Sequence, residues 1–181
     1  MKPGLDCLPG VLDKKRSVIE ILQHLEECNI AHFAYYSRTN YIDPSSSGLI
    51  LQQKDEFRNA VQDILTIYNL SEINLQHAQL AYLSACSTAK NKAACLADEA
   101  IHVVSGFQVA GCPHMIGCLW PSVDQVCVEI ARGFYTLLVE QGMLHLESRG
   151  IAVALHTSVI EVRAQNWKQP LNWAQFVHYR A

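Results

Sequence analysis

Apolar residues along the chain fall into two kinds of pattern. The first is helical spacing, with an apolar residue every three or four positions at Val18, Ile21, Leu22 and Leu25. The second is the continuous apolar and aromatic run of residues 30–36, which is typical of a buried strand. The pattern therefore predicts a helix that leads into a central strand.

Turn-forming residues separate the next periodic segments. Residues 40–48 predict a surface loop, and the alternation of Leu49 and Leu51 predicts a short strand after it. A second apolar strand is predicted over residues 79–85. Between these strands, helical spacing predicts an amphipathic helix through Phe57, Val61, Ile64 and Tyr68.

The second half of the chain continues the alternation. A predicted helix over residues 96–110 is closed by Gly111, and a strand is predicted over residues 114–120. A further helix is predicted over residues 125–141 and ends at Gly142. The last helix is predicted from the spacing of Ala152, Leu155, Val159 and Val162.

Strands that alternate with helices indicate an α/β fold, with a mainly parallel sheet that has helices on both faces. Ligand chemistry in such folds lies at the carboxyl ends of the strands. Two of the predicted strands end next to Tyr36 and Cys86. We therefore expect the functional residues at that edge.

Length and composition fit a single domain. The chain has 181 residues, of which 50% are hydrophobic, so it can bury one sizeable core. Residues 1–16 lack periodicity and predict a flexible leader ahead of a domain over residues 17–181. The net charge is −3 and no basic run exceeds Lys14-Lys15-Arg16, which argues against nucleic acid and anionic membranes as partners.

The sequence also predicts a cytoplasmic location. No stretch approaches the roughly 18 consecutive apolar residues of a spanning helix, and the first residues do not begin a secretory signal. The seven cysteines are odd in number and scattered, which fits reduced thiols rather than a disulfide framework.

Two motifs and the segments after them carry a family resemblance. The first motif is Ala31-His32-Phe33-Ala34, followed by Ser47-Gly48-Leu49, and the second is Ala81-Tyr82-Leu83-Ser84-Ala85-Cys86. Downstream segments such as Asp98-Glu99-Ala100 and the closing Trp173-Ala174-Gln175-Phe176 continue the similarity. Over about residues 17–181 the chain resembles CHAT domains of the fungal type, which are caspase-like domains of the clan that also contains separase.

This resemblance implies a three-layer caspase-like sandwich with a cysteine endopeptidase site and no cofactor. In that site a histidine after one strand deprotonates a cysteine after the next, and backbone N–H groups hold the oxyanion. Cys86 takes the position of the nucleophile, and Ser37 takes an oxyanion-hole backbone position. Family members read Ala-Cys-His-Gly where this chain reads Ala34-Tyr35-Tyr36-Ser37, so Tyr36 stands at the position of the catalytic histidine.

Loss of that histidine predicts an inactive peptidase site. An ordinary phenol has a pKa of about 10 and is a poor base at neutral pH. His32 lies about 13 Å before position 36 along an extended strand of roughly 3.3 Å per residue, so we expect it to be a packed core residue instead. The other histidines that folding could bring to Cys86 are His77, His102, His145, His156 and His178.

Asp124 has two interpretations. Its segment is similar to the part of separases whose aspartate receives a basic P1 side chain, which implies an acidic substrate pocket. Asp is also a favoured N-cap residue, and a helix is predicted to start near Gln125. We favour the cap and keep the pocket open.

Two further groups of residues favour structural roles. Cys112, His114 and Cys118 lack a Cys-x-x-Cys partner and fall on one buried face of a predicted strand, so we expect no metal site. The C-terminal aromatic residues are predicted to pack onto the helices of the sheet and close the core: Trp167, Trp173, Phe176 and Tyr179.

Family domains carry two more strands ahead of the histidine strand, whereas about 30 residues precede it here. In the caspase-like strand order, strand 30–36 would then lie at the edge of the sheet. An edge strand presents unpaired N–H and C=O groups to another chain. We therefore expect self-association or a protein partner at strand 30–36.

Three functional hypotheses follow. The first is a degenerate caspase-like module used for binding or assembly in a signalling or immune-type system. The second is an active cysteine endopeptidase in which another group replaces the base for Cys86. The third, an unrelated small-molecule α/β enzyme, is the weakest because the sequence has no Gly-rich phosphate loop.

Overall fold

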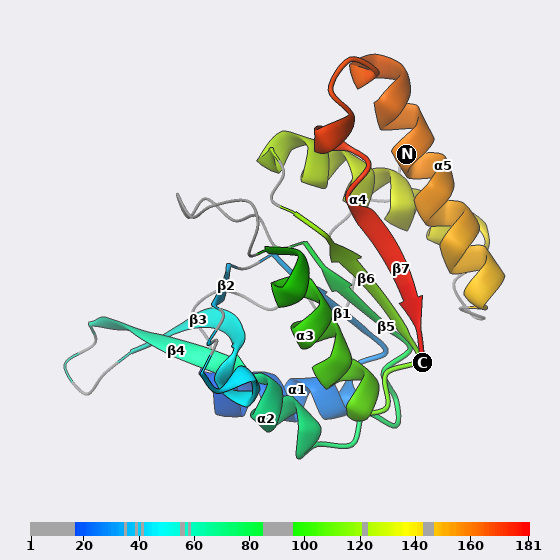
Figure 1. The fold of residues 1–181 in the computed structure, drawn as a ribbon. Coiled ribbons are helices and arrows are strands. Elements are labelled where there is room, and N and C mark those ends of the chain that lie inside the picture. Colours follow the sequence, from blue (N-terminus) through cyan, green and yellow to red (C-terminus); the bar gives the residue numbers. More distant parts are fainter. Residues whose placement is uncertain are drawn as a thin grey trace.

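The computed structural model describes residues 17–34, 36–38, 40, 42–54, 57, 59–84, 96–120, 123–142 and 147–181. The predicted leader and Cys86 lie outside these residues. The described chain forms a main sheet with helices on both of its faces and a smaller second sheet beside it (Figure 1). The predicted caspase-like α/β sandwich is confirmed.

The main sheet has the strand order β1-β5-β6-β7. Its strands are β1 (Ile30–Phe33), β5 (Leu80–Leu83), β6 (His114–Cys118) and β7 (Phe176–Arg180). The first three are parallel to one another, and β7 runs antiparallel to β6. The carboxyl ends of β1, β5 and β6 therefore meet at one edge of the sheet.

Each face of the main sheet has its own hydrophobic core. On one face, α1 (Val18–Glu27) and α3 (Leu96–Val109) pack against β1, β5 and β6 through residues that include Ile21, Phe107 and Met115. On the other face, α4 (Asp124–Glu140) and α5 (Ser148–Asn166) pack around Tyr82 and Ile116. Alternation along the strands explains why neighbouring residues such as Met115 and Ile116 serve opposite cores.

The start of α1 is fixed by several side chains. Ser17 and Glu20 form a capping box, which satisfies backbone N–H groups of the first turn. A carboxylate oxygen of Asp63 accepts a further hydrogen bond from the Val18 N–H at 3.0 Å. Since Asp63 belongs to the second sheet, this contact ties that sheet to α1.

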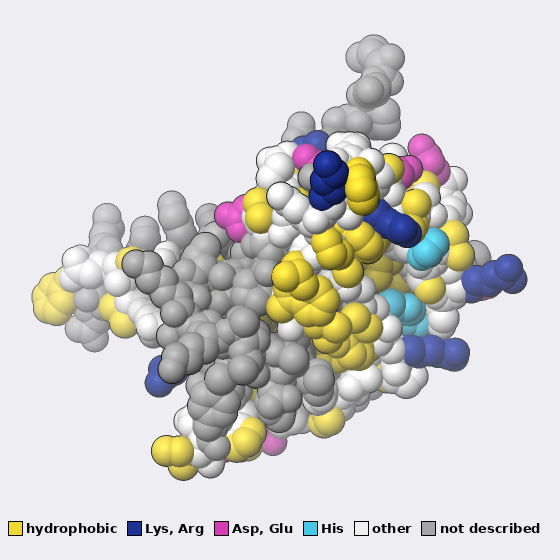
Figure 2. Space-filling view, turned by 45° about the horizontal axis from the view of Figure 1, so that its top comes forward, with side chains coloured by type: hydrophobic (Ala, Val, Ile, Leu, Met, Phe, Trp, Pro, Cys, Tyr) yellow, Lys and Arg dark blue, Asp and Glu magenta, His cyan; other side chains and the backbone are white. Residues whose placement is uncertain are grey.

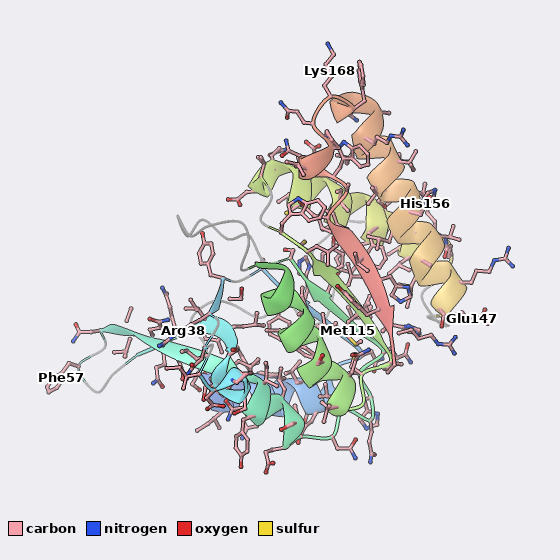
Figure 3. The ribbon with its side chains drawn as sticks, viewed as in Figure 1. Arg38, Phe57, Met115, Glu147, His156 and Lys168 are labelled. Atoms are coloured by element: carbon pink, nitrogen blue, oxygen red, sulfur yellow. The ribbon has the colours of Figure 1, made fainter. Side chains whose placement is uncertain are left out.

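The second sheet consists of β2 (Ser37–Arg38), β3 (Gly48–Lys54) and β4 (Ala60–Thr66), all antiparallel. The 3-10 helix Pro44–Ser46 precedes β3, and the short helix α2 (Ile67–Ser71) follows β4. The β3–β4 hairpin extends away from the main sheet, with Phe57 at its tip (Figure 3). Its base is anchored by buried Leu49, Leu51 and Leu65, which join the core under α1.

The helix predicted through Phe57, Val61, Ile64 and Tyr68 is wrong. Residues 60–66 form a strand that pairs with all seven residues of β3, and only Tyr68 lies in a helix. The helical spacing was accidental, since Phe57 and Tyr68 are 83% and 57% exposed and serve no common core face. The β-branched residues in this stretch were the signal for a strand.

The strand predicted over residues 30–36 is shorter than expected. Its main-sheet part ends at Phe33, and the Tyr36 carbonyl accepts a hydrogen bond from the Ile50 N–H at 2.7 Å. Residues 37 and 38 then pair with β3. The chain thus passes from the main sheet to the second sheet between positions 33 and 36.

The C-terminal segment adds a strand to the sheet, which the sequence analysis did not anticipate. Trp173 and Phe176 pack against the α4–α5 core and Tyr179 against the opposite core, so the predicted packing of these three residues is confirmed. Trp167 is 67% exposed, and for it the prediction is wrong. No helix among the residues that the structure describes is long and apolar enough to cross a membrane.

Gly48 gives a test of the second sheet. A Cβ at this position would overlap the Leu65 carbonyl across the β3–β4 pair. We expect Gly48→Ala to lower the free energy of unfolding in urea by about 2 kcal/mol, because the hairpin must open to admit the methyl group. Gly150→Ala is the matched control, since its Cβ meets only the far end of the Gln141 side chain. Equal stability of the two variants would contradict the close approach.

Candidate functional site

The candidate site lies at the carboxyl edge of the main sheet, where β1 and β5 end side by side. Phe33 and Leu83, the last residues of the two strands, are partners in the register. The Ser84 N–H then donates to the Phe33 carbonyl at 2.8 Å, which extends the pairing by one residue. Positions 36 and 86 each follow three residues after these strand ends.

Both predicted site residues, Tyr36 and Cys86, therefore follow strands that end at the same edge of the sheet. Tyr36 is described, and its side chain is 41% exposed. Cys86 lies outside the described residues, as do its neighbours from 85 to 95. The prediction that Cys86 faces the position 36 side chain stays a prediction.

Tyr36 and Ser37 are positioned by the second sheet rather than by β1. The main-chain hydrogen bond from Ile50 holds the Tyr36 carbonyl, and Ser37 is paired with Leu49. Two buried leucines of the hairpin base, Leu49 and Leu51, anchor this arrangement in the core. The backbone at positions 36 and 37 is therefore held by β3.

His32 is half-buried in an aromatic cluster on the face of the sheet that α4 covers. Its Nε2 lies 3.4 Å from the Ser84 Oγ, and its ring packs 4.7 Å from that of Tyr82 and 5.6 Å from that of Tyr135. Burial lowers the pKa of His32 to about 4, so the imidazole is neutral at neutral pH. The prediction that His32 is a packed residue with a hydrogen-bond partner is confirmed.

The two tyrosines of this cluster keep their phenol protons at neutral pH. The hydroxyl groups of Tyr82 and Tyr135 are buried and have no hydrogen-bond partner among the residues that the structure describes. Burial raises the pKa of both phenols above the ordinary value of 10. Neither phenol therefore supplies a base at neutral pH.

The sequence analysis missed the link between His32 and Ser84. Ser84 is two residues before Cys86, and its side chain lies on the same face of the sheet as Tyr82. Period-two alternation along β5 was the signal that could have found it. The contact joins the middle of β1 to the segment that leads to Cys86.

Asp124 is the first residue of α4 and not its cap. Val123 is the N-cap, and it makes no side-chain capping hydrogen bond, so the predicted cap role of Asp124 is wrong. The helix starts one residue earlier than expected, which moves the carboxylate into the first turn. There it interacts favourably with the positive end of the helix dipole. The acidic-pocket interpretation stays a prediction, since residues 121 and 122 lie outside the described chain.

The other histidines with described side chains lie away from this edge. His77 is exposed and precedes β5, at the opposite edge of the sheet, and exposed His156 lies on α5 (Figure 3). The His178 Nε2 lies 3.2 Å from the His114 Nδ1, which pairs β7 with β6. The side chains of His102 and His145 fall outside the described part.

The three residues considered for a metal are all buried. Cys112 donates to the His114 carbonyl through its Sγ at 3.4 Å, and burial raises the pKa of this thiol to about 11. His114 contacts His178, and Cys118 is 5% exposed. Within the described ranges no three His, Cys, Asp or Glu side chains are placed to hold a metal ion together.

Comparison with known families gives one match. The model of the family described as "CHAT domain" matches residues 10–181, a span that includes the whole main sheet and both positions 36 and 86. No curated protein matches the chain.

The His32 cluster predicts a pH dependence of stability. The pKa of His32 is lower in the folded protein than its ordinary value of 6.5, so the unfolded chain takes up a proton first as the pH falls. The contribution of the neutral His32 to the free energy of unfolding is complete above pH 6.5. It is lost as the pH falls toward 4, by a total on the order of 3 kcal/mol.

Urea unfolding between pH 7 and 4 measures this loss. We expect His32→Gln, which keeps a polar group for Ser84, to have a flatter pH profile than the wild type. His77→Gln removes an exposed histidine and is the control, with an unchanged profile. If His32→Gln and the wild type lose stability in parallel as the pH falls, the pKa of His32 is not lowered by folding.

Proposed function

Because the chain belongs to the CHAT domain family, a caspase-like family related to cysteine peptidases, we propose that it is a pseudo-peptidase that acts by binding or assembly. The proposal is supported by Tyr36, which takes the position that the family resemblance gives to the catalytic histidine and has a backbone held by β3. The setting we propose is a signalling or immune-type system. We also propose that the domain is of the fungal type and that the protein is cytoplasmic.

The chemical argument concerns the thiolate. A free cysteine has a pKa of about 8.5 and is mostly protonated at neutral pH, so a cysteine peptidase needs a neighbouring imidazole to generate its nucleophile. The same imidazole later protonates the leaving amine. An ordinary phenol performs neither step well, because its pKa of about 10 makes it a poor base at neutral pH and a weak acid toward the leaving amine.

His32 does not supply the missing base. Its pKa of about 4 makes it a weak proton acceptor, and its Nε2 faces Ser84. Moving it toward position 36 would separate it from the rings of Tyr82 and Tyr135. The alternative, an active endopeptidase that uses Cys86 with a substituted base, rests on the retained Leu-Ser-Ala-Cys block and is an outcome of the test below.

The edge of β1 is the surface we propose for assembly. In the described part of the main sheet, β1 is a terminal strand that pairs with β5 alone. The Asn29 and Phe33 carbonyls accept hydrogen bonds from the β5 side. Since backbone groups alternate along a strand, those of Ile30 and His32 point outward, where a strand of a second copy or of a partner protein can add.

Substitution of Tyr36 tests the pseudo-peptidase proposal. We expect wild-type Cys86 to react with iodoacetamide at pH 7 no faster than an ordinary thiol, and a peptide library to remain uncleaved. Tyr36→His should raise the alkylation rate of Cys86 roughly tenfold, because an imidazolium lowers the pKa of a neighbouring thiol toward 7. Tyr36→Phe is the matched control and should leave the rate unchanged. Peptide cleavage by the wild type that disappears in Cys86→Ala would establish the active endopeptidase instead.

Substitution of Ile30 tests assembly through β1. Proline is tolerated at the first position of an edge strand but removes the outward N–H that an added strand needs. We expect the wild type to be larger than a monomer in light scattering at high concentration, and Ile30→Pro to be monomeric with an unchanged circular dichroism spectrum. Ile30→Val keeps the N–H and should behave as the wild type. A monomeric wild type with no strand-adding partner would refute the assembly surface.

A further inference from the structure

All three tryptophans of the chain lie in the segment that ends and follows α5 or are bonded to it. Trp120 follows β6, Trp167 is the C-cap of α5, and Trp173 follows the 3-10 helix Pro170–Asn172. The Trp120 Nε1 donates to the Leu171 carbonyl at 2.6 Å, which joins the end of β6 to the segment after α5. We call Trp120, Trp167, Leu171 and Trp173, together with the two cations described below, the tryptophan corner.

The corner exposes much of its apolar surface. Leu171 is 69% exposed and Trp167 is 67% exposed, whereas Trp120 and Trp173 are half-buried. Figure 2 shows hydrophobic side chains gathered on the face that carries the start of β7 and the end of α5. Apolar groups that large and that close together usually mark a binding surface.

Two cations complete the corner. The Arg163 guanidinium carbon lies 5.3 Å from the centre of the Trp173 ring, and the Lys168 Nζ lies 5.4 Å from that of the Trp167 ring. Both side chains are exposed, and Lys168 lies beyond the end of α5 (Figure 3). Stacking on the rings restricts these long side chains, so less entropy is lost when they bind an anion.

The aromatic rings and the two cations together indicate the chemistry of the partner. Trp and Arg are the residues most enriched at the centres of protein interfaces, because they offer large rigid surfaces and planar donors. The Trp120 N–H is already bonded to Leu171, so its ring offers an apolar face rather than a donor. Arginine and lysine beside that surface match carboxylates.

We propose that the tryptophan corner binds a peptide segment of a partner protein that combines apolar and acidic side chains. This inference rests on the proposed binding function and names the class of partner for it. Two cations are fewer than the clusters of basic residues that bind nucleic acid or an anionic membrane, so the corner favours a peptide with a few carboxylates over those partners.

Selection from a displayed random peptide library tests the corner. We expect the selected peptides to be rich in Asp or Glu with Leu or Phe, and their binding to weaken with salt. Binding should shift the intrinsic fluorescence, because all three fluorescent indoles lie at the corner. The affinity should fall about tenfold in Trp167→Ala with Leu171→Ala, and severalfold in Arg163→Gln with Lys168→Gln.

The control variant is Val139→Ala, which removes an apolar side chain of α4 that is 53% exposed. It should bind the selected peptides as the wild type does. Peptides that bind equally well to the corner variants, a selection of basic peptides, or no selected peptide at all would overturn the proposal. Sedimentation with phosphatidylserine vesicles that depends on the corner would assign it to lipid and would also overturn it. None of these results bears on Cys86, so failure here is distinct from failure of the pseudo-peptidase proposal.

Discussion

The parallel pairing of β1 with β5 is the constraint on which the site depends. Their register places Phe33 beside Leu83, and the Ser84 N–H continues the ladder by bonding to the Phe33 carbonyl. Because both strands end together, the segments that carry positions 36 and 86 leave from one edge of the sheet. The His32–Ser84 contact adds a side-chain link between the same two strands, under a cover of aromatic rings. A shift of one residue in this register would turn His32 and Tyr82 to the opposite core.

The second sheet holds the backbone at positions 36 and 37. After β1 the chain pairs with β3: the Ile50 N–H donates to the Tyr36 carbonyl, and Ser37 is paired with Leu49. Gly48 has no Cβ, which lets β4 approach β3 closely. The residue that this frame presents is Tyr36, and our proposal of binding rather than catalysis rests on a phenol at that position.

Much of the fold could be predicted from the sequence. The helix that starts at Val18 and the helices closed by Gly111 and Gly142 were found because apolar spacing and positive-φ glycines are local signals. The β4 strand was mistaken for a helix because its partner, β3, is not visible in the spacing of its own residues. For the site, the two strands were predicted, although β1 and β5 end three and two residues earlier than expected. The His32–Ser84 contact and the tryptophan corner were not predicted. Both join residues that are far apart in sequence, with separations of 52 and 51 positions, and only tertiary packing brings them together.

The measurement that tests the central claim most directly is the pH dependence of Cys86 alkylation in the wild-type chain, followed by peptide mass spectrometry, with Cys86→Ala to identify the labelled peptide. If Tyr36 leaves the thiol without a base, the rate should rise with a midpoint at or above the ordinary cysteine pKa of about 8.5. A midpoint well below that value would mean that another group generates the thiolate, and would contradict the account of a peptidase scaffold without its base.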